Sequence, residues 1–184
     1  MSKNLNRRSF IKNSSVTGLA AILLPAISSS PIIAATHNER SIKLHNTHTG
    51  ESFKQTYWEK GKYIEESMKS ISTLLRDHRT NDIIDFDPKL IDYLYLINQK
   101  LDNKNPINIV SGYRSPETNR KLRRQGRGVA KNSFHMYGRA VDFYIPEHAF
   151  KIVKKAAFSV SKGGVGDYPY SGFIHIDTGP LRRW

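Results

Sequence analysis

After the first 35 residues, which differ from the rest of the chain, two short segments alternate apolar and polar side chains. They are Ser41–Asn46 and Glu51–Trp58, and Thr49-Gly50 lies between them. Alternation places successive side chains on opposite faces of a strand, and glycine suits a tight turn. The pattern therefore predicts a β-hairpin.

Two longer segments repeat apolar side chains every three or four residues, which is typical of a helix with one buried face. The first is Tyr63–Arg79, and the second begins at Asp87-Pro88. Asp87 can cap the free backbone amides of that helix, and Pro88 fits its first turn. The two apolar stripes comprise Ile64, Met68, Ile71, Leu74 and Leu75, and then Leu90, Ile91, Leu94, Ile97 and Leu101.

Shorter elements follow in the remaining half of the chain. A cap-and-proline pair at Ser115-Pro116 predicts a helix to about Arg124, and Glu147–Ser161 predicts another. Apolar runs predict strands at Ile107–Val110, Ala140–Ile145 and Phe173–Asp177, whereas Gly163–Gly166 is either a loop or a short strand. Separate runs of helices and strands indicate an α+β fold with a small antiparallel sheet packed with helices.

Residues 1–35 differ from the rest of the chain and resemble an export signal. Asn6–Lys12 reads Asn-Arg-Arg-Ser-Phe-Ile-Lys and matches the twin-arginine signature. The apolar stretch Val16–Ile27 is shorter than the roughly 20 residues that span a bilayer. We expect cleavage near Ala34-Ala35, which leaves 36–184 as one domain without a stable membrane anchor. The alternative is a signal anchor that is never cut.

Composition indicates the cellular compartment in which the protein acts and the kind of partner that it attracts. There is no cysteine, so neither a disulfide framework nor a lipid-modified cysteine is available. Loss of the four basic residues of 1–35, which holds no acidic residue, lowers the formal net charge from +13 to +9. A basic protein attracts polyanions, which in an envelope means the cell wall and lipid headgroups. The densest basic cluster is either a solvated face or a substrate-attracting patch, and it comprises Lys121, Arg123, Arg124, Arg127 and Lys131.

Two predicted strands bring together side chains that bind zinc. Asp142 lies within an apolar strand, where an unpaired carboxylate is costly, and alternation places it opposite Val141. His175 lies on the last strand, and His135 precedes the strand of Asp142. If the two strands are neighbours, these residues form a set of three ligands with a fourth position open, as in catalytic zinc sites.

Each of these motifs alone is weak evidence for a metal. A single His-x-Asp is usually a surface pair, or a pair in which the carboxylate orients the histidine, so that alternative stays open on spacing alone. The other histidines have no comparable partners in the sequence. We expect them at the surface, and they are His37, His45, His48, His78 and His148.

Several motifs together give the chain a family resemblance. It resembles the zinc D-Ala-D-Ala peptidases of the LAS group, and within that group the exported murein endopeptidase K branch. The shared motifs are Ser111-Gly-Tyr-Arg-Ser115, Asn119, the segment Ser133–Asp142, Gly164-Val-Gly166 and His175-Ile-Asp177, together with Leu44–Glu51 and Leu75–Thr80. The whole set is specific, although no single motif is.

The resemblance implies a hedgehog/D,D-peptidase-like fold in which His135, Asp142 and His175 bind Zn²⁺. It also implies that Arg114 contacts a substrate carboxylate or the transition state, which its planar guanidinium suits. The alternative for Arg114 is a turn residue with a surface ion pair. The implied substrates are peptidoglycan stem peptides, cut at D-Ala–meso-diaminopimelate or diaminopimelate–diaminopimelate cross-links.

The chain departs from this group at the general base. Many relatives carry Glu, Asp or His two or three residues before the last ligand, where this chain has Phe173 and Gly172. Asp177 shares the strand face of His175 and is the expected substitute. It either accepts a proton from the zinc water or orients His175. Asp167, before the last strand, is the weaker candidate for the base.

These expectations describe an exported zinc metallopeptidase that hydrolyses stem-peptide cross-links of peptidoglycan in the periplasm. The main alternative is a non-catalytic peptidoglycan-binding module in which zinc only stabilises the fold. A nucleic-acid-binding protein would also be basic, but the export signal and the lack of a recognisable reader helix argue against it. We therefore expect no nucleic-acid partner. Endopeptidase and carboxypeptidase activity are not distinguished by the sequence.

Overall fold

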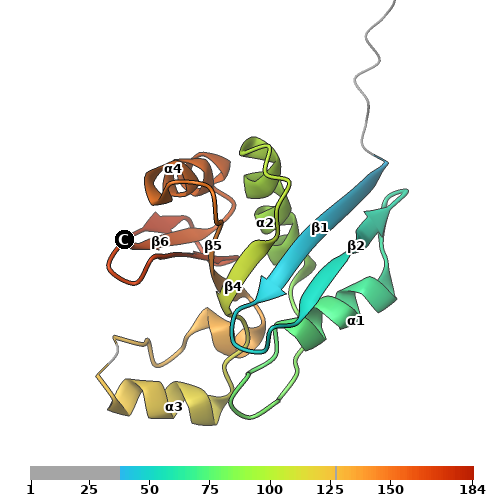
Figure 1. Cartoon of the computed structure of the whole chain (residues 1–184). Coiled ribbons are helices and arrows are strands. Elements are labelled where there is room, and N and C mark those ends of the chain that lie inside the picture. The colour runs from blue at the N-terminus through green and yellow to red at the C-terminus, as the bar shows by residue number, and fades with distance from the viewer. Residues whose placement is uncertain (1–37, 127) are drawn as a thin grey trace, which may run out of the picture. The chain divides into compact units, whose positions relative to one another are not determined.

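The described residues, 38–126 and 128–184 of this computed structural model, are built on one sheet with strand order β3-β2-β1-β4-β5-β7-β6-β8 (Figure 1). Most neighbouring strands are antiparallel, but β1 and β4 are parallel, as are β6 and β8. The α+β class is confirmed, while the sheet is larger and more mixed than predicted. The strands are β1 Glu39–Asn46, β2 Ser52–Glu59, β3 Lys62–Tyr63, β4 Ile107–Ser111, β5 Ala140–Tyr144, β6 Gly164–Tyr168, β7 Phe173–Asp177 and β8 Arg182–Arg183.

The predicted signal segment, residues 1–35, lies outside the described residues. The predicted hairpin is confirmed as β1 and β2, which pair antiparallel. Among the described residues, no helix has both the length and the apolar character needed to cross a bilayer.

The helix starts that the sequence marks with a capping residue are confirmed. The Asp87 side chain accepts a hydrogen bond from the Lys89 amide at 3.0 Å, and the Ser115 hydroxyl accepts one from the Thr118 amide at 3.2 Å. Each cap satisfies a backbone donor that the first helical turn leaves free. The helices are α1 Glu65–Leu74, α2 Pro88–Lys100, α3 Pro116–Arg124 and α4 Phe150–Val160, with a 3₁₀ helix, η1, at Phe134–Tyr137.

Two helices are shorter than predicted because local turns interrupt them. α1 ends at Leu74, after which the carboxylate of Asp77 accepts a hydrogen bond from the Arg79 amide and turns the chain. α4 begins three residues after the predicted start, because Glu147 adopts a φ of +45° that no α-helix accommodates. The apolar stripe of α1 continues one residue past the end of the helix, to Leu75.

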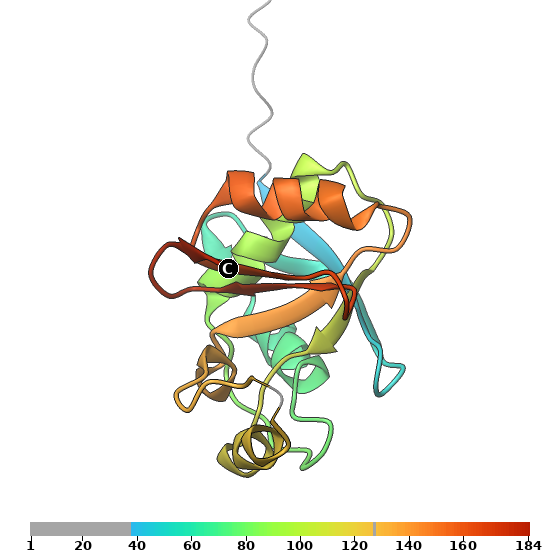
Figure 2. The ribbon, with the colours of Figure 1, turned by 90° about the vertical axis from the view of Figure 1, so that its left-hand side faces the viewer.

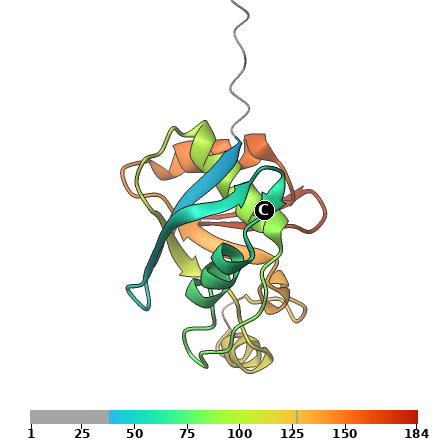
Figure 3. The same cartoon turned by 90° about the vertical axis from the view of Figure 1, so that its right-hand side faces the viewer.

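Helices α1, α2 and α4 contribute to one hydrophobic core with the sheet. Val141 and Phe143 of β5 belong to this core, as do Ile174 and Ile176 of β7. Figure 2 shows α4 above the strands, with η1 and α3 on the other side, and Figure 3 shows α1 beside the β1–β2 hairpin. Alternation along β5 and β7 therefore places the intervening residues on the face turned away from the core.

Candidate metal centre

Asp142 and His175 are directly opposite each other on neighbouring strands. They are register partners of the antiparallel pair β5–β7, so their side chains leave the same face of the sheet. The Nδ1 atom of His175 lies 2.7 Å from Oδ1 of Asp142. The sequence predicted that these two side chains lie together, and the register of β5 against β7 explains why they do.

His135 reaches the same point from η1. Its Nε2 lies 3.3 Å from Nδ1 of His175 and 3.3 Å from Oδ1 of Asp142. Its other ring nitrogen, Nδ1, lies 2.7 Å from the carbonyl oxygen of Gly112. Since a carbonyl can only accept, Nδ1 carries the hydrogen and Nε2 keeps a lone pair directed at the other two residues.

These three side chains fit a zinc ion. In tetrahedral zinc sites, bonds of about 2.0–2.1 Å place neighbouring ligand atoms roughly 3.3 Å apart. The two distances from Nε2 of His135 match that spacing, and one ligand atom from each residue lies within 4.8 Å of the other two. All three side chains are buried, with His135 only 1% exposed. The arrangement can therefore hold a metal with three protein ligands.

The electrostatics of the centre favour an ionised carboxylate and a cation beside it. Burial lowers the pKa of His135, which leaves the imidazole neutral and able to bind a metal. Burial alone would raise the pKa of Asp142, but the charges and hydrogen bonds of His135 and His175 hold it well below its ordinary value. For His175, burial is outweighed by hydrogen bonds to Asp142 and Asp177, which raise its pKa.

Arg114 lies against His135, Asp142 and His175, called the metal-ligand set below, rather than in a surface turn. Its Nη2 donates to Oδ2 of Asp142 at 2.5 Å, and its Nε donates to the hydroxyl of Ser111 at 3.0 Å. Its backbone amide donates to the carbonyl of His135 at 3.2 Å. The side chain is only 14% exposed and lines the hollow beside the centre. These contacts place a fixed positive charge next to the ligands.

Asp177 lies on the opposite side of the His175 ring from Asp142. Its Oδ2 accepts from Nε2 of His175 at 3.1 Å, whereas Nδ1 of the same ring faces Asp142. The carboxylate is fully buried and also accepts from the Gly164 and Gly179 amides and from Arg182. Burial would raise its pKa, but His175 and Arg182 lower it to about 2. Of the two predicted roles, the contacts favour orientation of His175 and argue against the general base.

Asp167, the weaker candidate for the base, lies on the other face of the sheet. It is paired in register with the core residue Ile174, and its carboxylate binds Lys154 of α4 at 2.7 Å. Alternation along β6 therefore directs it away from the metal-ligand set. The structure corrects this prediction.

The centre opens into a groove made of two adjoining hollows. One has a volume of about 410 Å³ and includes Arg182 and Trp184 in its wall, and the other has about 420 Å³ and includes His48 and Arg79. Both are lined by Arg114, Asp142, Val129, Tyr168 and Phe173. A chain-like substrate can thus extend to both sides of Asp142.

The remaining histidines are not all isolated. His48 and His78 stack with ring centroids 3.8 Å apart, and His45 contacts Ser52. His78 is half-buried, and burial lowers its pKa to about 4. The expected surface position is confirmed for His48, which is exposed, but the expectation that these histidines have no partner is wrong for this pair. His37 lies outside the described residues.

Arg182 and Trp184 are part of the centre, although the sequence did not single them out. They lie on and just after β8, a strand of two residues that no periodicity can reveal. The one signal is the short distance along the chain from Asp177 to a following arginine. Of the basic cluster, Lys121, Arg123, Arg124 and Lys131 are exposed, and Arg127 lies outside the described residues.

Comparison with known proteins gives one consistent result. The family described as peptidoglycan L,D-endopeptidase MepK matches residues 34–184. The peptidoglycan L,D-endopeptidase MepK of Escherichia coli (strain K12) is 42% identical over 179 residues, which are 97% of this chain and 97% of that protein. The probable peptidoglycan L,D-endopeptidase MepK of Haemophilus influenzae is 41% identical over 153 residues, 83% of this chain and 82% of that protein. The predicted resemblance is confirmed, and the chain belongs to the peptidoglycan L,D-endopeptidase MepK family.

Proposed function

We propose that this protein is a zinc-dependent endopeptidase that cleaves cross-links between peptidoglycan stem peptides. The observation that carries the proposal is the convergence of His135, Asp142 and His175 in a groove whose two adjoining hollows both include Asp142 in their walls. The relatives are named L,D-endopeptidases. Of the two cross-links considered, that name favours the diaminopimelate–diaminopimelate bond, which joins an L centre to a D centre.

The three ligands would hold the zinc, and each has a defined partner. Gly112 fixes the ring of His135, Asp177 fixes the ring of His175, and Arg114 binds the second oxygen of Asp142. Zinc bound in this way would supply Lewis acidity and a source of nucleophilic hydroxide near neutral pH. Arg114 then provides a cation beside the reacting carbonyl, suited to a substrate carboxylate or to developing negative charge.

The experiment that tests this function is digestion of purified sacculi, with mass analysis of the released fragments. We expect cross-linked muropeptides to be converted to monomers, chelation to stop the reaction, and zinc to restore it. His135→Ala should abolish both zinc binding and cleavage. His45→Ala serves as the matched control, since this histidine of β1 forms its side-chain hydrogen bond, among the described residues, with Ser52 rather than with the metal-ligand set. Binding to sacculi without any cleavage would instead support the non-catalytic module.

We also propose that the protein reaches the periplasm by the twin-arginine route. Arg7 and Arg8 carry this proposal. Replacing both with lysine keeps the charge but removes the recognition signature, so precursor should accumulate in the cytoplasm. Fractionation and immunoblotting measure this, and unchanged periplasmic delivery would contradict the route without affecting the proposed enzyme.

A further inference from the structure

Arg182 makes a two-point ion pair with Asp177, the partner of His175. Its Nη2 donates to Oδ2 of Asp177 at 2.6 Å, and its Nη1 donates to Oδ1 at 3.0 Å. Such forked pairs fix orientation as well as charge, because two parallel hydrogen bonds allow a single geometry. Together with the Gly164 and Gly179 amides, the arginine therefore fixes how the Asp177 carboxylate is turned.

This pair continues directly to the metal-ligand set. The Oδ2 atom that Arg182 binds is the same oxygen that contacts Nε2 of His175 at 3.1 Å. The opposite ring nitrogen, Nδ1, faces Asp142. Arg182 of β8 is thus connected to the metal ligand His175 through the carboxylate of Asp177.

The same guanidinium also reaches the segment that carries the other histidine. It lies 5.2 Å from the ring centre of Phe134, which directly precedes His135, and 4.8 Å from the ring centre of Trp184. The Trp184 ring in turn lies 5.3 Å from the ring of His175. Arg182 therefore contacts groups next to both histidine ligands.

Glycines leave the space that this arrangement needs. A Cβ atom at Gly164 would lie 2.6 Å from Nη1 of Arg182, and one at Gly166 would lie 2.6 Å from the indole of Trp184. At Gly179 a Cβ would come 2.6 Å from the ring of Phe134. Close approach, rather than a left-handed backbone, explains these glycines, since none of the three has a positive φ.

We infer that Arg182 is a positioning residue of the metal centre, which holds Asp177 and through it sets the orientation of His175 for zinc binding. This inference rests on the proposed zinc centre. Carboxylates that orient a metal-bound histidine typically contribute 10- to 100-fold to metal affinity. Arg182 acts one contact farther out, by keeping that carboxylate turned toward the ring.

A purely structural role is the competing explanation, since Arg182 could simply attach β8 to the sheet. Arg183 separates the two possibilities. It belongs to the same strand, and its Nη2 donates to the carbonyl of Phe158 at 3.0 Å, with the guanidinium over that ring. Within the described part of the chain, its guanidinium contacts Phe158 rather than the metal-ligand set. Arg183→Gln thus removes the same charge from the same strand.

The test measures zinc affinity of the full mature protein by competition with a chromophoric chelator, with folding of each metal-free variant checked by circular dichroism. We expect Arg182→Gln to bind zinc about 10-fold more weakly than the unchanged protein, at the lower end of the usual range. Arg182→Lys keeps the charge but not the two-point hydrogen bond, so its zinc affinity should lie between those of Arg182→Gln and the unchanged protein. Arg183→Gln should bind zinc as the unchanged protein does. The visible spectrum of the cobalt-substituted protein should change only in the Arg182 variants.

Equal zinc affinity and equal cobalt spectra in Arg182→Gln and Arg183→Gln would overturn the inference and leave the proposed function intact. If Arg182→Gln does not fold, the folded Arg182→Lys variant decides. Weaker zinc binding by that variant supports the inference, and unchanged binding overturns it. An unchanged protein that binds no zinc would overturn the proposed metal centre itself, and the inference with it.

Discussion

The two histidines of the centre present different ring nitrogens to the metal position, and a partner on the far side of each ring explains the difference. The carbonyl of Gly112 engages Nδ1 of His135, which leaves Nε2 for the metal. Asp177 engages Nε2 of His175, which leaves Nδ1. Fixing the tautomer by a second contact is the usual way in which proteins orient metal-bound histidines.

Asp177→Asn tests this assignment at the scale of one residue. The amide keeps the shape and can still accept from Nε2 of His175, but it loses the ion pair with Arg182. We expect weaker zinc binding, by about 10-fold, with turnover restored when zinc is supplied in excess. Chelator competition and assays at increasing zinc concentration measure both effects. Retained zinc with turnover lost by 10²- to 10⁴-fold, the usual contribution of a general base, would instead identify Asp177 as the base.

At the scale of elements, the sequence predicted what local chemistry dictates. Side-chain caps and prolines marked the starts of α2 and α3, and alternation placed Asp142 and His175 on one face. Elements that depend on distant partners were missed or left open. The glycines of β6 leave room for Arg182 at Gly164 and for Trp184 at Gly166, and the two-residue strand β8 pairs with β6. Arg182 was not predicted as part of the site because it lies on β8, whose pairing partner is distant in the sequence.

The 3₁₀ helix that carries His135 depends on Gly138. This glycine has a φ of +63°, and a Cβ atom there would lie 2.6 Å from the carbonyl oxygen of Asp85. Gly138→Ala should therefore both destabilise the fold by more than about 1 kcal/mol and weaken zinc binding through a displaced η1. Gly126→Ala is the matched control, since Gly126 has a φ of +69° but open space around it. Thermal unfolding and zinc titration compare the two, and equal effects would show that the backbone strain alone matters.

The loop between α1 and α2 depends on the buried carboxylate of Asp77. It accepts from the Arg79 amide at 3.0 Å and from the Ser115 amide at 2.9 Å, and so ties this loop to the start of α3. Burial opposes ionisation, but these and further hydrogen bonds hold the pKa of Asp77 below its ordinary value. A lowered pKa in the folded state stabilises the fold above the ordinary value of about 3.9 and loses that contribution as the pH falls below it.

Asp77→Asn should therefore reduce the free energy of unfolding near neutral pH by about 1.5–3 kcal/mol, the contribution of a hydrogen bond to a charged group. The difference from the unchanged protein should shrink below about pH 4, where the carboxylate of the unfolded chain becomes protonated, and vanish once the folded one is protonated as well. Urea unfolding of the metal-free proteins at several pH values measures this. A difference that stays constant across the range would mean that the charge of Asp77 contributes nothing.

At the scale of the whole domain, the sheet separates a hydrophobic core from a chemically active face. The core residues of β5 and β7 face the helices, and the metal-ligand set faces the groove, with α3 on the side of η1 (Figure 2). Helix α3 borders this groove through Leu122, and the same helix carries three exposed cations, Lys121, Arg123 and Arg124. Charge placed beside a groove raises the local concentration of an anionic polymer.

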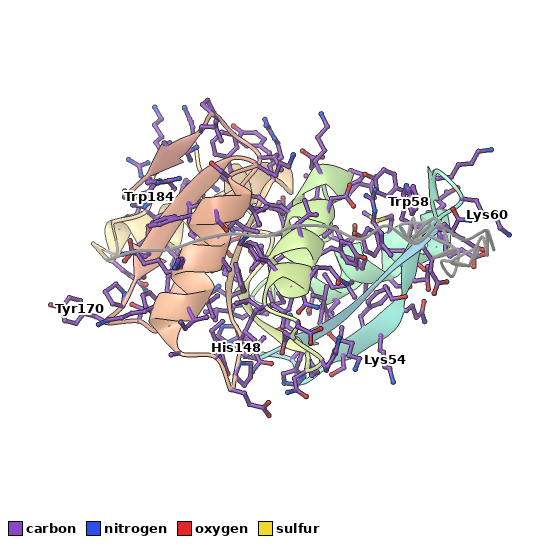
Figure 4. The ribbon with its side chains drawn as sticks, turned by 90° about the horizontal axis from the view of Figure 1, so that it is seen from above. Lys54, Trp58, Lys60, His148, Tyr170 and Trp184 are labelled. Carbon is purple, nitrogen blue, oxygen red and sulfur yellow. The ribbon has the colours of Figure 1, made fainter. Side chains whose placement is uncertain are left out.

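Replacing Lys121, Arg123 and Arg124 with glutamine should therefore slow digestion of sacculi at low salt while leaving cleavage of a small soluble cross-linked muropeptide nearly unchanged. The difference should fade as salt rises, since the screening length shortens from about 10 Å at 0.1 M to about 3 Å at 1 M. Neutralising Lys54, Lys60 and Lys62 makes the same change in net charge on β2, β3 and their turn, and Figure 4 shows Lys54 and Lys60 at the opposite end from Trp184. This control should digest sacculi as the unchanged protein does. An equal loss in both triple variants would show that net charge, rather than the α3 surface, directs the protein to its substrate.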